Sequence, residues 1–362
     1  MIAPISFFDF TEHGGNIYYY AKKLGLSPFE LIDLSSSANP LVKNFIENEL
    51  EKFLKILEFY PDPEGEELKE ALSRTYGVKT EHLVLGNGSY ELLQWLILSL
   101  PSETVFFLLE PTFVGYRKIL QIRRDIKLTY HISLDPEEHL EALEKFLKRG
   151  NYPRAVLICN PANPTGTLFT KRELSTLIET YEKTYFIVDE AFIEFVEEES
   201  LLGEVEAYKN LFVFRSFSKF YGLAGARIGY LGSQNPYINH LKKIIPTWSA
   251  NSLSQYLAKS LILNSDFKKI SLEHFKRLKN LFEKTLDDLK VSYFKSFTNF
   301  YLIRELPRGK EFFFWLLKEK HILVRPCYNF LGLTENDLRV SLKDEESLNL
   351  FLEALREWVE AL

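Results

Sequence analysis

The chain has 362 residues, of which 46% are hydrophobic and 15% aromatic, and this composition excludes intrinsic disorder for most of its length. The 44 Lys and Arg are outnumbered by 50 Asp and Glu, so the net charge of −6 disfavours binding to nucleic acid or an anionic membrane. The two cysteines, Cys159 and Cys327, exclude a disulfide framework and predict a reducing, cytoplasmic setting. No basic residue precedes Lys22 and no apolar run is membrane-length, so we expect neither a signal peptide nor a membrane span.

Between about residues 80 and 232, short apolar runs alternate with amphipathic ones. This alternation predicts a mostly parallel sheet with helices on both faces. The predicted strands are 82–85, 104–109, 155–159, 185–188, 211–215 and 227–231. The predicted helices are 91–100, 138–147 and 171–181.

After about residue 245 the pattern predicts a smaller α+β domain. Its predicted helices are 254–263, 272–289, 309–320 and 345–361, and its predicted strands are 299–303, 322–325 and 337–342. The first 40 residues show no strand pattern. We therefore predict an N-terminal arm (1–40) that packs on the small domain, a large domain (41–245) and a small C-terminal domain (246–362).

The strongest local motif runs from Ser216 to Gly229 and follows a buried strand. Lys219 lies between two serines and the later Arg227, which suits a Schiff-base lysine beside a phosphate site. Its amine can form an imine with an aldehyde, while Ser216, Ser218 and Arg227 can bind a phosphate. For the Ser-x-Ser-Lys segment alone, a surface lysine in a polar loop is the more common explanation.

A second motif places Asp189 at the end of the apolar run 185–188. Ligands of α/β sheets bind at the carboxyl ends of the strands. A carboxylate there can pair with a pyridinium nitrogen and keep a cofactor ring protonated. A helix N-cap or a metal-binding carboxylate explains Asp189 about equally well, although no His or Cys spacing indicates a metal.

A third motif, residues 159–166, has two Asn-Pro pairs and a glycine directly after a predicted strand. Proline and glycine at these positions predict a rigid loop that would hold the Asn163 amide at the mouth of the sheet. The alternative is a turn that binds no ligand.

The fourth motif, residues 85–91, joins a strand to a helix through Gly86, Gly88 and Ser89. Small residues with available N–H groups at a helix N-terminus can bind an anion. The segment matches neither a Walker motif nor a dinucleotide fingerprint. Together the four motifs supply an anion cradle, an amide, a carboxylate and a lysine at successive strand ends, which is the set that a pyridoxal phosphate site requires.

These motifs resemble the fold-type I pyridoxal phosphate enzymes over nearly the whole chain, with further matches in residues 60–62, 110–116 and 248–251. The resemblance implies an aspartate-aminotransferase-like α/β fold, with a large, mostly parallel sheet domain and a smaller α+β C-terminal domain. It implies that Lys219 binds the cofactor covalently, Asp189 pairs with the pyridine nitrogen, Asn163 bonds the ring hydroxyl and Phe113 stacks on the ring. The other implied cofactor contacts are Gly88, Ser89, Tyr90, Ser216, Ser218 and Arg227.

The same resemblance implies a homodimer with shared sites, in which Tyr60 reaches the cofactor of a neighbouring subunit. Many of these enzymes have tyrosine where this chain has Phe192. The missing hydroxyl would remove one bond to the ring oxygen of the cofactor.

Within this group the chain resembles the threonine-phosphate decarboxylases of cobalamin biosynthesis, through His13-Gly-Gly-Asn16 and the run Arg325–Leu333. The residues implied to bind the substrate are His13, Gly14, Ser37, Asn39, Arg325 and Arg339. The decarboxylases usually read Asn-x-Asn-Pro where this chain reads Ser37-Ala38-Asn39-Pro40, so Ser37 either replaces an amide contact with a hydroxyl or loses that contact.

The resemblance implies decarboxylation of L-threonine O-3-phosphate to 1-amino-2-propanol O-2-phosphate. The alternative enzyme is a histidinol-phosphate aminotransferase, which shares most of the same motifs. The non-enzymatic alternative is a binding protein on the same scaffold, and the presence of Lys219, Asp189 and Arg227 argues against it.

Overall fold

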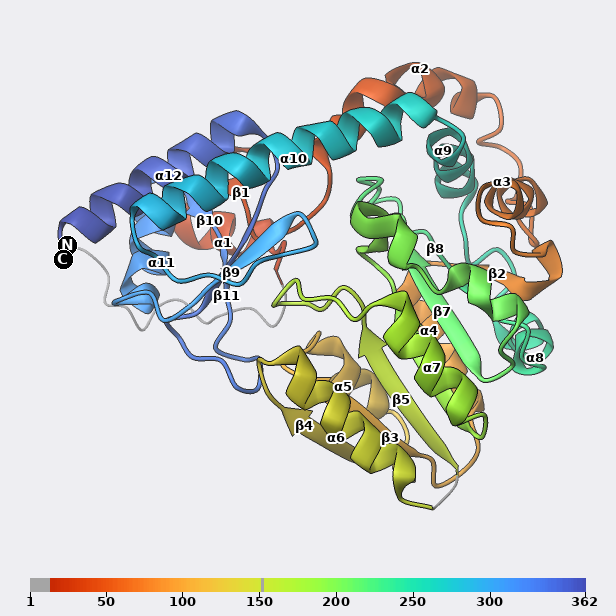
Figure 1. Ribbon diagram of the computed structural model, residues 1–362. Helices are drawn as coiled ribbons and strands as arrows, with labels where there is room; N and C mark the ends of the chain where they lie inside the picture. Colours follow the sequence, from red (N-terminus) through yellow and green to blue (C-terminus); the bar gives the residue numbers. More distant parts are fainter. Residues whose placement is uncertain (1–13, 151–152) are drawn as a thin grey trace. The chain divides into compact units, whose positions relative to one another are not determined.

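The computed structural model describes residues 14–150 and 153–362, and the chain divides into two compact units. The sheet unit comprises residues 38–163 and 167–271. The terminal unit comprises residues 164–166 and 272–362 together with the N-terminal residues up to Ser37, of which 14–37 are described. Figure 1 labels most of the helices and strands of both units.

The sheet unit contains, within its described residues, a seven-stranded sheet of order β2-β8-β7-β6-β5-β3-β4. β8 runs antiparallel to both of its neighbours, and the other pairings are parallel. This confirms the predicted α/β class with a mostly parallel sheet. The strands are β2 (Leu83–Gly86), β3 (Val105–Glu110), β4 (Lys127–Ile132), β5 (Arg154–Cys159), β6 (Thr184–Asp189), β7 (Leu211–Ser216) and β8 (Gly229–Gly232).

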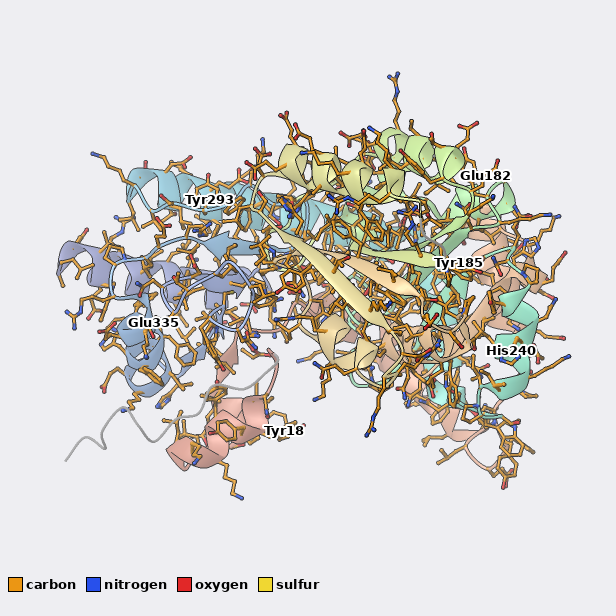
Figure 2. The ribbon with its side chains drawn as sticks, turned by 90° about the horizontal axis from the view of Figure 1, so that it is seen from below. Tyr18, Glu182, Tyr185, His240, Tyr293 and Glu335 are labelled. Atoms are coloured by element: carbon orange, nitrogen blue, oxygen red, sulfur yellow. The ribbon has the colours of Figure 1, made fainter. Side chains whose placement is uncertain are left out.

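The central strands form because their residues are apolar on both faces, as strands covered by helices on each side require. Every residue of β5 and β7 is buried, whereas the edge strand β4 is largely exposed. In Figure 1, α7 (Lys171–Thr180) lies in front of the sheet and α4 (Ser89–Ser99) lies behind β7. Tyr185 of β6, labelled in Figure 2, packs its ring against Phe212 of β7 and against Tyr237, the first residue of α8 (Tyr237–Ile244).

The helices of the sheet unit begin at well-defined caps. Thr170 and Glu173 form a capping box at the start of α7, and Asp135 caps α6 with a proline at the first helical position. The helices are α2 (Lys43–Leu54), α3 (Glu66–Tyr76), α4 (Ser89–Ser99), α5 (Gly115–Leu120), α6 (Pro136–Lys148), α7 (Lys171–Thr180), α8 (Tyr237–Ile244) and α9 (Ser252–Ile262). Short 3-10 helices cover 40–42, 80–82, 193–199 and 202–206.

The boundary between the units lies at residue 271, not at the predicted residue 245. Helix α9 packs on α2 and α3, and the long helix α10 (Ser265–Asp288) starts in the sheet unit. There Phe267 is fully buried against Phe45, Phe220 and Tyr221. The strand pattern stops at about residue 245, but packing against the sheet unit continues for another 26 residues.

The terminal unit joins the N-terminal segment to the C-terminal part of the chain. β1 (Ile32–Asp33) pairs in parallel with β10 (Ile322–Leu323), although the first 40 residues show no strand pattern in the sequence. A two-residue strand is too short to show alternation. The antiparallel sheet of this unit has the order β11-β12-β9. Its remaining elements are α1 (Ile17–Leu24), a 3-10 helix at 28–30, β9 (Phe300–Ile303), α11 (Gly309–Glu319), β11 (Arg325–Pro326), β12 (Leu338–Ser341) and α12 (Glu345–Glu360).

A buried ion network lies beside the ends of β6 and β7. Arg215 Nε lies 3.0 Å from Glu190 Oε2, and both side chains are fully buried. Arg215 also lies 2.6 Å from Glu197 and has its guanidinium over the ring of Tyr76. Burial raises the pKa of the nearby Glu194 to about 8, so this carboxyl is mostly protonated at neutral pH and adds little charge.

Replacing Arg215 with methionine should strongly destabilise the chain, because it leaves Glu190 buried without its cation. We expect the free energy of unfolding, measured with urea, to fall by about 3–5 kcal/mol. The control is Arg74→Met, which removes an exposed arginine bonded to Glu70 and should cost less than about 1 kcal/mol. Equal losses in the two variants would contradict this account of the network.

Candidate active site

Lys219 lies in the turn that follows β7, and its backbone is fixed on two sides. Its carbonyl accepts hydrogen bonds from the N–H groups of Gly222 (3.1 Å) and Asn39 (2.9 Å). Gly222 has φ +67°, and a Cβ there would lie 2.4 Å from the carbonyl oxygen of Asn39, so the turn requires glycine. The Lys219 ammonium nitrogen lies 5.8 Å from the ring centroid of Phe192.

Asn39, predicted to bind the substrate, lies beside this turn and is 1% exposed. Its side-chain N–H groups donate to the carbonyl of Phe220 (2.9 Å) and to Ser271 Oγ (2.8 Å). Its amide oxygen accepts from the N–H of Leu41. These bonds hold the lysine turn, and a direct contact between Asn39 and substrate stays a prediction.

Asp189 ends β6, where its carboxylate receives two hydrogen bonds. The Tyr116 hydroxyl donates to Oδ2 (2.7 Å) and the N–H of Ala191 donates to Oδ1 (3.1 Å). Burial raises the pKa of Asp189, while these two bonds and the charge of Lys219 oppose that rise. Tyr116 belongs to a matched motif, but no pattern in the sequence indicates its contact with Asp189, which lies 73 residues away.

Gly88, Ser89, Arg227 and Gly229 form a cradle at the start of α4. Gly88 has φ +86°, and a Cβ there would lie 2.5 Å from Arg227 Nη2. A Cβ at Gly229 would lie 2.4 Å from the N–H nitrogen of Ser89, the first residue of α4. Two glycines therefore let a guanidinium and a helix N-terminus come together.

The serines of the lysine motif lie next to this cradle. The N–H of Ser218 donates to Ser216 Oγ (3.2 Å), and Arg227 Nη1 donates to Ser218 Oγ (3.4 Å). All the residues predicted to hold a phosphate from within the chain thus lie together in the sheet unit. Their donors are N–H groups, hydroxyls and a guanidinium, which suit a phosphate dianion.

The aromatic residues of the site lie on α4, just before α5 and on α5. The ring of Phe113 lies edge-on to those of Tyr90 (6.1 Å) and Tyr116 (5.3 Å). Asn163, 8% exposed, lies in the loop after β5. Tyr60 differs from these side chains because it is 78% exposed. Its ring stacks on that of Trp248, with the ring centroids 4.4 Å apart.

The other predicted substrate residues belong to the terminal unit. Arg325 and Arg339 are direct cross-strand partners on β11 and β12, and both are buried. The Arg325 guanidinium donates to Asn329 (2.7 Å) and lies over the ring of Phe330, while that of Arg339 lies over the ring of Phe300.

Ser35 connects Arg339 to the N-terminal segment. Arg339 Nη2 donates to the Ser35 carbonyl (2.7 Å), and the N–H of Gly15 donates to Ser35 Oγ (2.7 Å). A Cβ at Gly14 would lie 3.3 Å from Arg339 Nη2, so the predicted Gly14 and Arg339 do lie close together. Asp33 was not predicted, yet it fixes this turn by accepting from the N–H and the hydroxyl of Ser35.

Two predicted substrate residues remain. The Ser37 hydroxyl is hydrogen-bonded to that of Ser341 (2.8 Å) and Ser37 is 1% exposed, so its role toward substrate stays a prediction. His13 lies outside the described residues.

Among the described residues, no group of three or more His, Cys, Asp or Glu side chains could hold a metal, and no helix is long and apolar enough to cross a membrane.

A family model described as "Aminotransferase class I and II" matches residues 30–355. The chain belongs to this family. It is 33% identical over 364 residues to a histidinol-phosphate aminotransferase of Methanothermobacter thermautotrophicus, covering 96% of this chain and 94% of that protein. It is 28% identical over 360 residues to the adenosylcobalamin biosynthesis bifunctional protein CobDQ of Leptospira interrogans, covering 96% of this chain but only 41% of the length of that protein.

The cofactor of this aminotransferase-family chain is pyridoxal 5'-phosphate. A solved histidinol-phosphate aminotransferase from Sinorhizobium meliloti contains it and shares the fold at a TM-score of 0.83, with 21% identity over 100% of this chain and 98% of that one. The residues of the sheet unit fit the group: the glycine-lined cradle suits its phosphate, and the Asp189 carboxylate suits a protonated ring nitrogen.

Gly88→Ala should weaken binding of pyridoxal phosphate, because the added methyl group would displace the Arg227 guanidinium. We expect the dissociation constant, measured by cofactor fluorescence, to rise by about tenfold or more. The control is Gly77→Ala, which has a similar φ of +74° but nothing within 4 Å of the added Cβ. Unchanged cofactor affinity in Gly88→Ala would show that Gly88 and Arg227 do not form the phosphate site.

Proposed function

We propose that this chain is a pyridoxal phosphate-dependent carboxy-lyase that converts L-threonine O-3-phosphate to 1-amino-2-propanol O-2-phosphate for cobalamin biosynthesis. The observation that carries the proposal is the pairing of Arg325 and Arg339 across two strands, with Gly14–Gly15 bonded to the same turn. Two arginines at opposed positions of neighbouring strands suit a phosphate dianion better than a single carboxylate. The similarity to the bifunctional cobalamin protein supports the same reading.

Bound pyridoxal phosphate supplies an electron sink for the electron pair left at the substrate Cα. Asp189 would hold the proton on the ring nitrogen, and Asn163 would bond the ring hydroxyl. The amine of Lys219 would give a proton to the substrate Cα in place of the departing carbon dioxide.

Orientation of the substrate decides which bond at Cα breaks, because only a bond perpendicular to the cofactor ring is weakened. If Arg325 and Arg339 hold the side-chain phosphate, the carboxylate is left to stand perpendicular and leave. If they hold the α-carboxylate in the ring plane, the Cα–H bond breaks and transamination follows. The second candidate function, a histidinol-phosphate aminotransferase, is favoured by the 33% identity over nearly the whole of that relative.

We further propose that the chain acts as a cytoplasmic homodimer. The exposed side chains of Leu54, Leu57, Phe59 and Tyr60 form an apolar segment, and the ring of Trp248 stacks on Tyr60. Contiguous exposed apolar side chains are typical of interaction surfaces, and a second copy is the proposed occupant. Cys159 and Cys327 are both buried and not disulfide-bonded, which suits a reducing compartment.

The reaction is tested by incubating the cofactor-loaded protein with L-threonine O-3-phosphate in the absence of any keto acid. We expect repeated turnover to a product lighter by one carbon dioxide, detected by mass spectrometry, because decarboxylation needs no acceptor. Lys219→Ala should abolish it. Turnover that requires 2-oxoglutarate, with histidinol phosphate as the amino donor, would instead assign the chain to the aminotransferases.

Arg339→Ala should weaken substrate binding more than it slows the chemical step, because Arg339 is proposed to anchor the phosphate. We expect KM for L-threonine O-3-phosphate to rise by roughly ten- to hundredfold, the value of one hydrogen bond to a charged group. Arg356→Ala, an exposed arginine on α12 of the same unit, is the control. A KM that does not change in Arg339→Ala rules out its anchoring role.

A further inference from the structure

Burial disfavours the charged form of the Asp189 carboxylate and raises its pKa. Other groups must therefore stabilise the ionised form. Of the groups that oppose this rise, the Tyr116 hydroxyl makes the shorter of the two described hydrogen bonds, 2.7 Å against 3.1 Å for the N–H of Ala191.

Tyr116 is held so that its hydroxyl has little freedom to leave Asp189. The side chain is fully buried on α5, and its ring lies edge-on to that of Phe113 at 5.3 Å. The N–H of Tyr116 donates to the carbonyl of Phe113 (3.0 Å), which fixes the backbone. The thiol of Cys159, the register partner of Asp189 on the neighbouring strand, lies near the Tyr116 hydroxyl and donates to the Pro161 carbonyl (3.3 Å).

The direction of the bond follows from the charges. Burial and the nearby Asp189 carboxylate both raise the pKa of Tyr116 well above its ordinary value, so the phenol keeps its proton. A protonated phenol facing a carboxylate donates, and such a bond favours the ionised form of the acid.

We propose that Tyr116 is a positioning residue, which holds the Asp189 carboxylate ionised and directed toward the ring nitrogen of pyridoxal phosphate. It need not touch the cofactor to do so. This role rests on the cofactor of the family and not on the choice between decarboxylation and transamination. A failure of the proposed reaction therefore leaves the role of Tyr116 unaffected.

The test is Tyr116→Phe in the full chain, with binding of pyridoxal phosphate measured across pH in the absence of substrate. We expect roughly ten- to hundredfold weaker binding at neutral pH. As pH falls, affinity should be lost at a higher pH than in the wild type, because Asp189 now protonates more easily. The titratable groups facing Asp189 in the described residues are Tyr116, Cys159 and Lys219.

Two comparisons separate positioning from a general packing effect. A cofactor analogue with carbon in place of the ring nitrogen should bind wild type and Tyr116→Phe equally, because it has no nitrogen to pair with Asp189. On an Asp189→Asn background, Tyr116→Phe should add little further loss.

The matched control is Tyr301→Phe in the terminal unit. It also removes a buried tyrosine hydroxyl that donates to a carboxylate, that of Glu283, at 2.5 Å. It should leave cofactor affinity unchanged. Wild-type affinity and pH dependence in Tyr116→Phe, or an equal loss with the carbon analogue, would overturn the proposal. If Tyr116→Phe does not fold, Cys159→Ala, which loosens the same hydroxyl, should give a weakening of a few-fold, and no change there would also overturn it.

Discussion

The buried ion pair between Glu190 and Arg215 is the interaction on which the cofactor site depends most. Each partner is the immediate neighbour of a site residue, since Glu190 follows Asp189 and Arg215 precedes Ser216. Successive residues of an extended chain point in opposite directions, so the ion pair fixes both strand ends from one side while the site residues face the other. The N–H of Glu190 also donates to the Phe214 carbonyl (2.8 Å), which ties the end of β6 to β7.

The residues that suit the cofactor and the residues proposed to bind the substrate belong to different units. The sheet unit holds the residues that suit pyridoxal phosphate, and these are features that decarboxylases and aminotransferases share. The terminal unit holds Arg325 and Arg339 together with the Asp33–Ser36 turn that orients Arg339. Burial would raise the pKa of Asp33, but Lys343 and the two serine hydroxyls outweigh it and lower that pKa. The proposed choice of reaction rests on Arg325 and Arg339, and the similarity to both kinds of relative does not decide it.

Much of the sheet unit could be predicted from sequence because its signals are local. An apolar run followed by Asp189, or by Ser216 and Lys219, marks both a strand and the chemistry at its end. The contact of Tyr116 with Asp189 joins residues far apart in the chain, and no spacing rule reveals it. The extension of the sheet unit to residue 271 was missed because helix α9 has the same pattern whichever unit it packs against, and β1 was missed because two residues cannot show a period.

Substrate labelled with deuterium at Cα tests the central claim most directly, because the two candidate reactions differ in the bond that breaks there. Decarboxylation breaks the bond from Cα to the carboxylate and leaves the Cα–H bond intact. We expect the 1-amino-2-propanol O-2-phosphate formed from Cα-deuterated L-threonine O-3-phosphate to retain all of its deuterium. Loss of the deuterium to water, together with formation of a keto acid, would contradict the account and establish transamination.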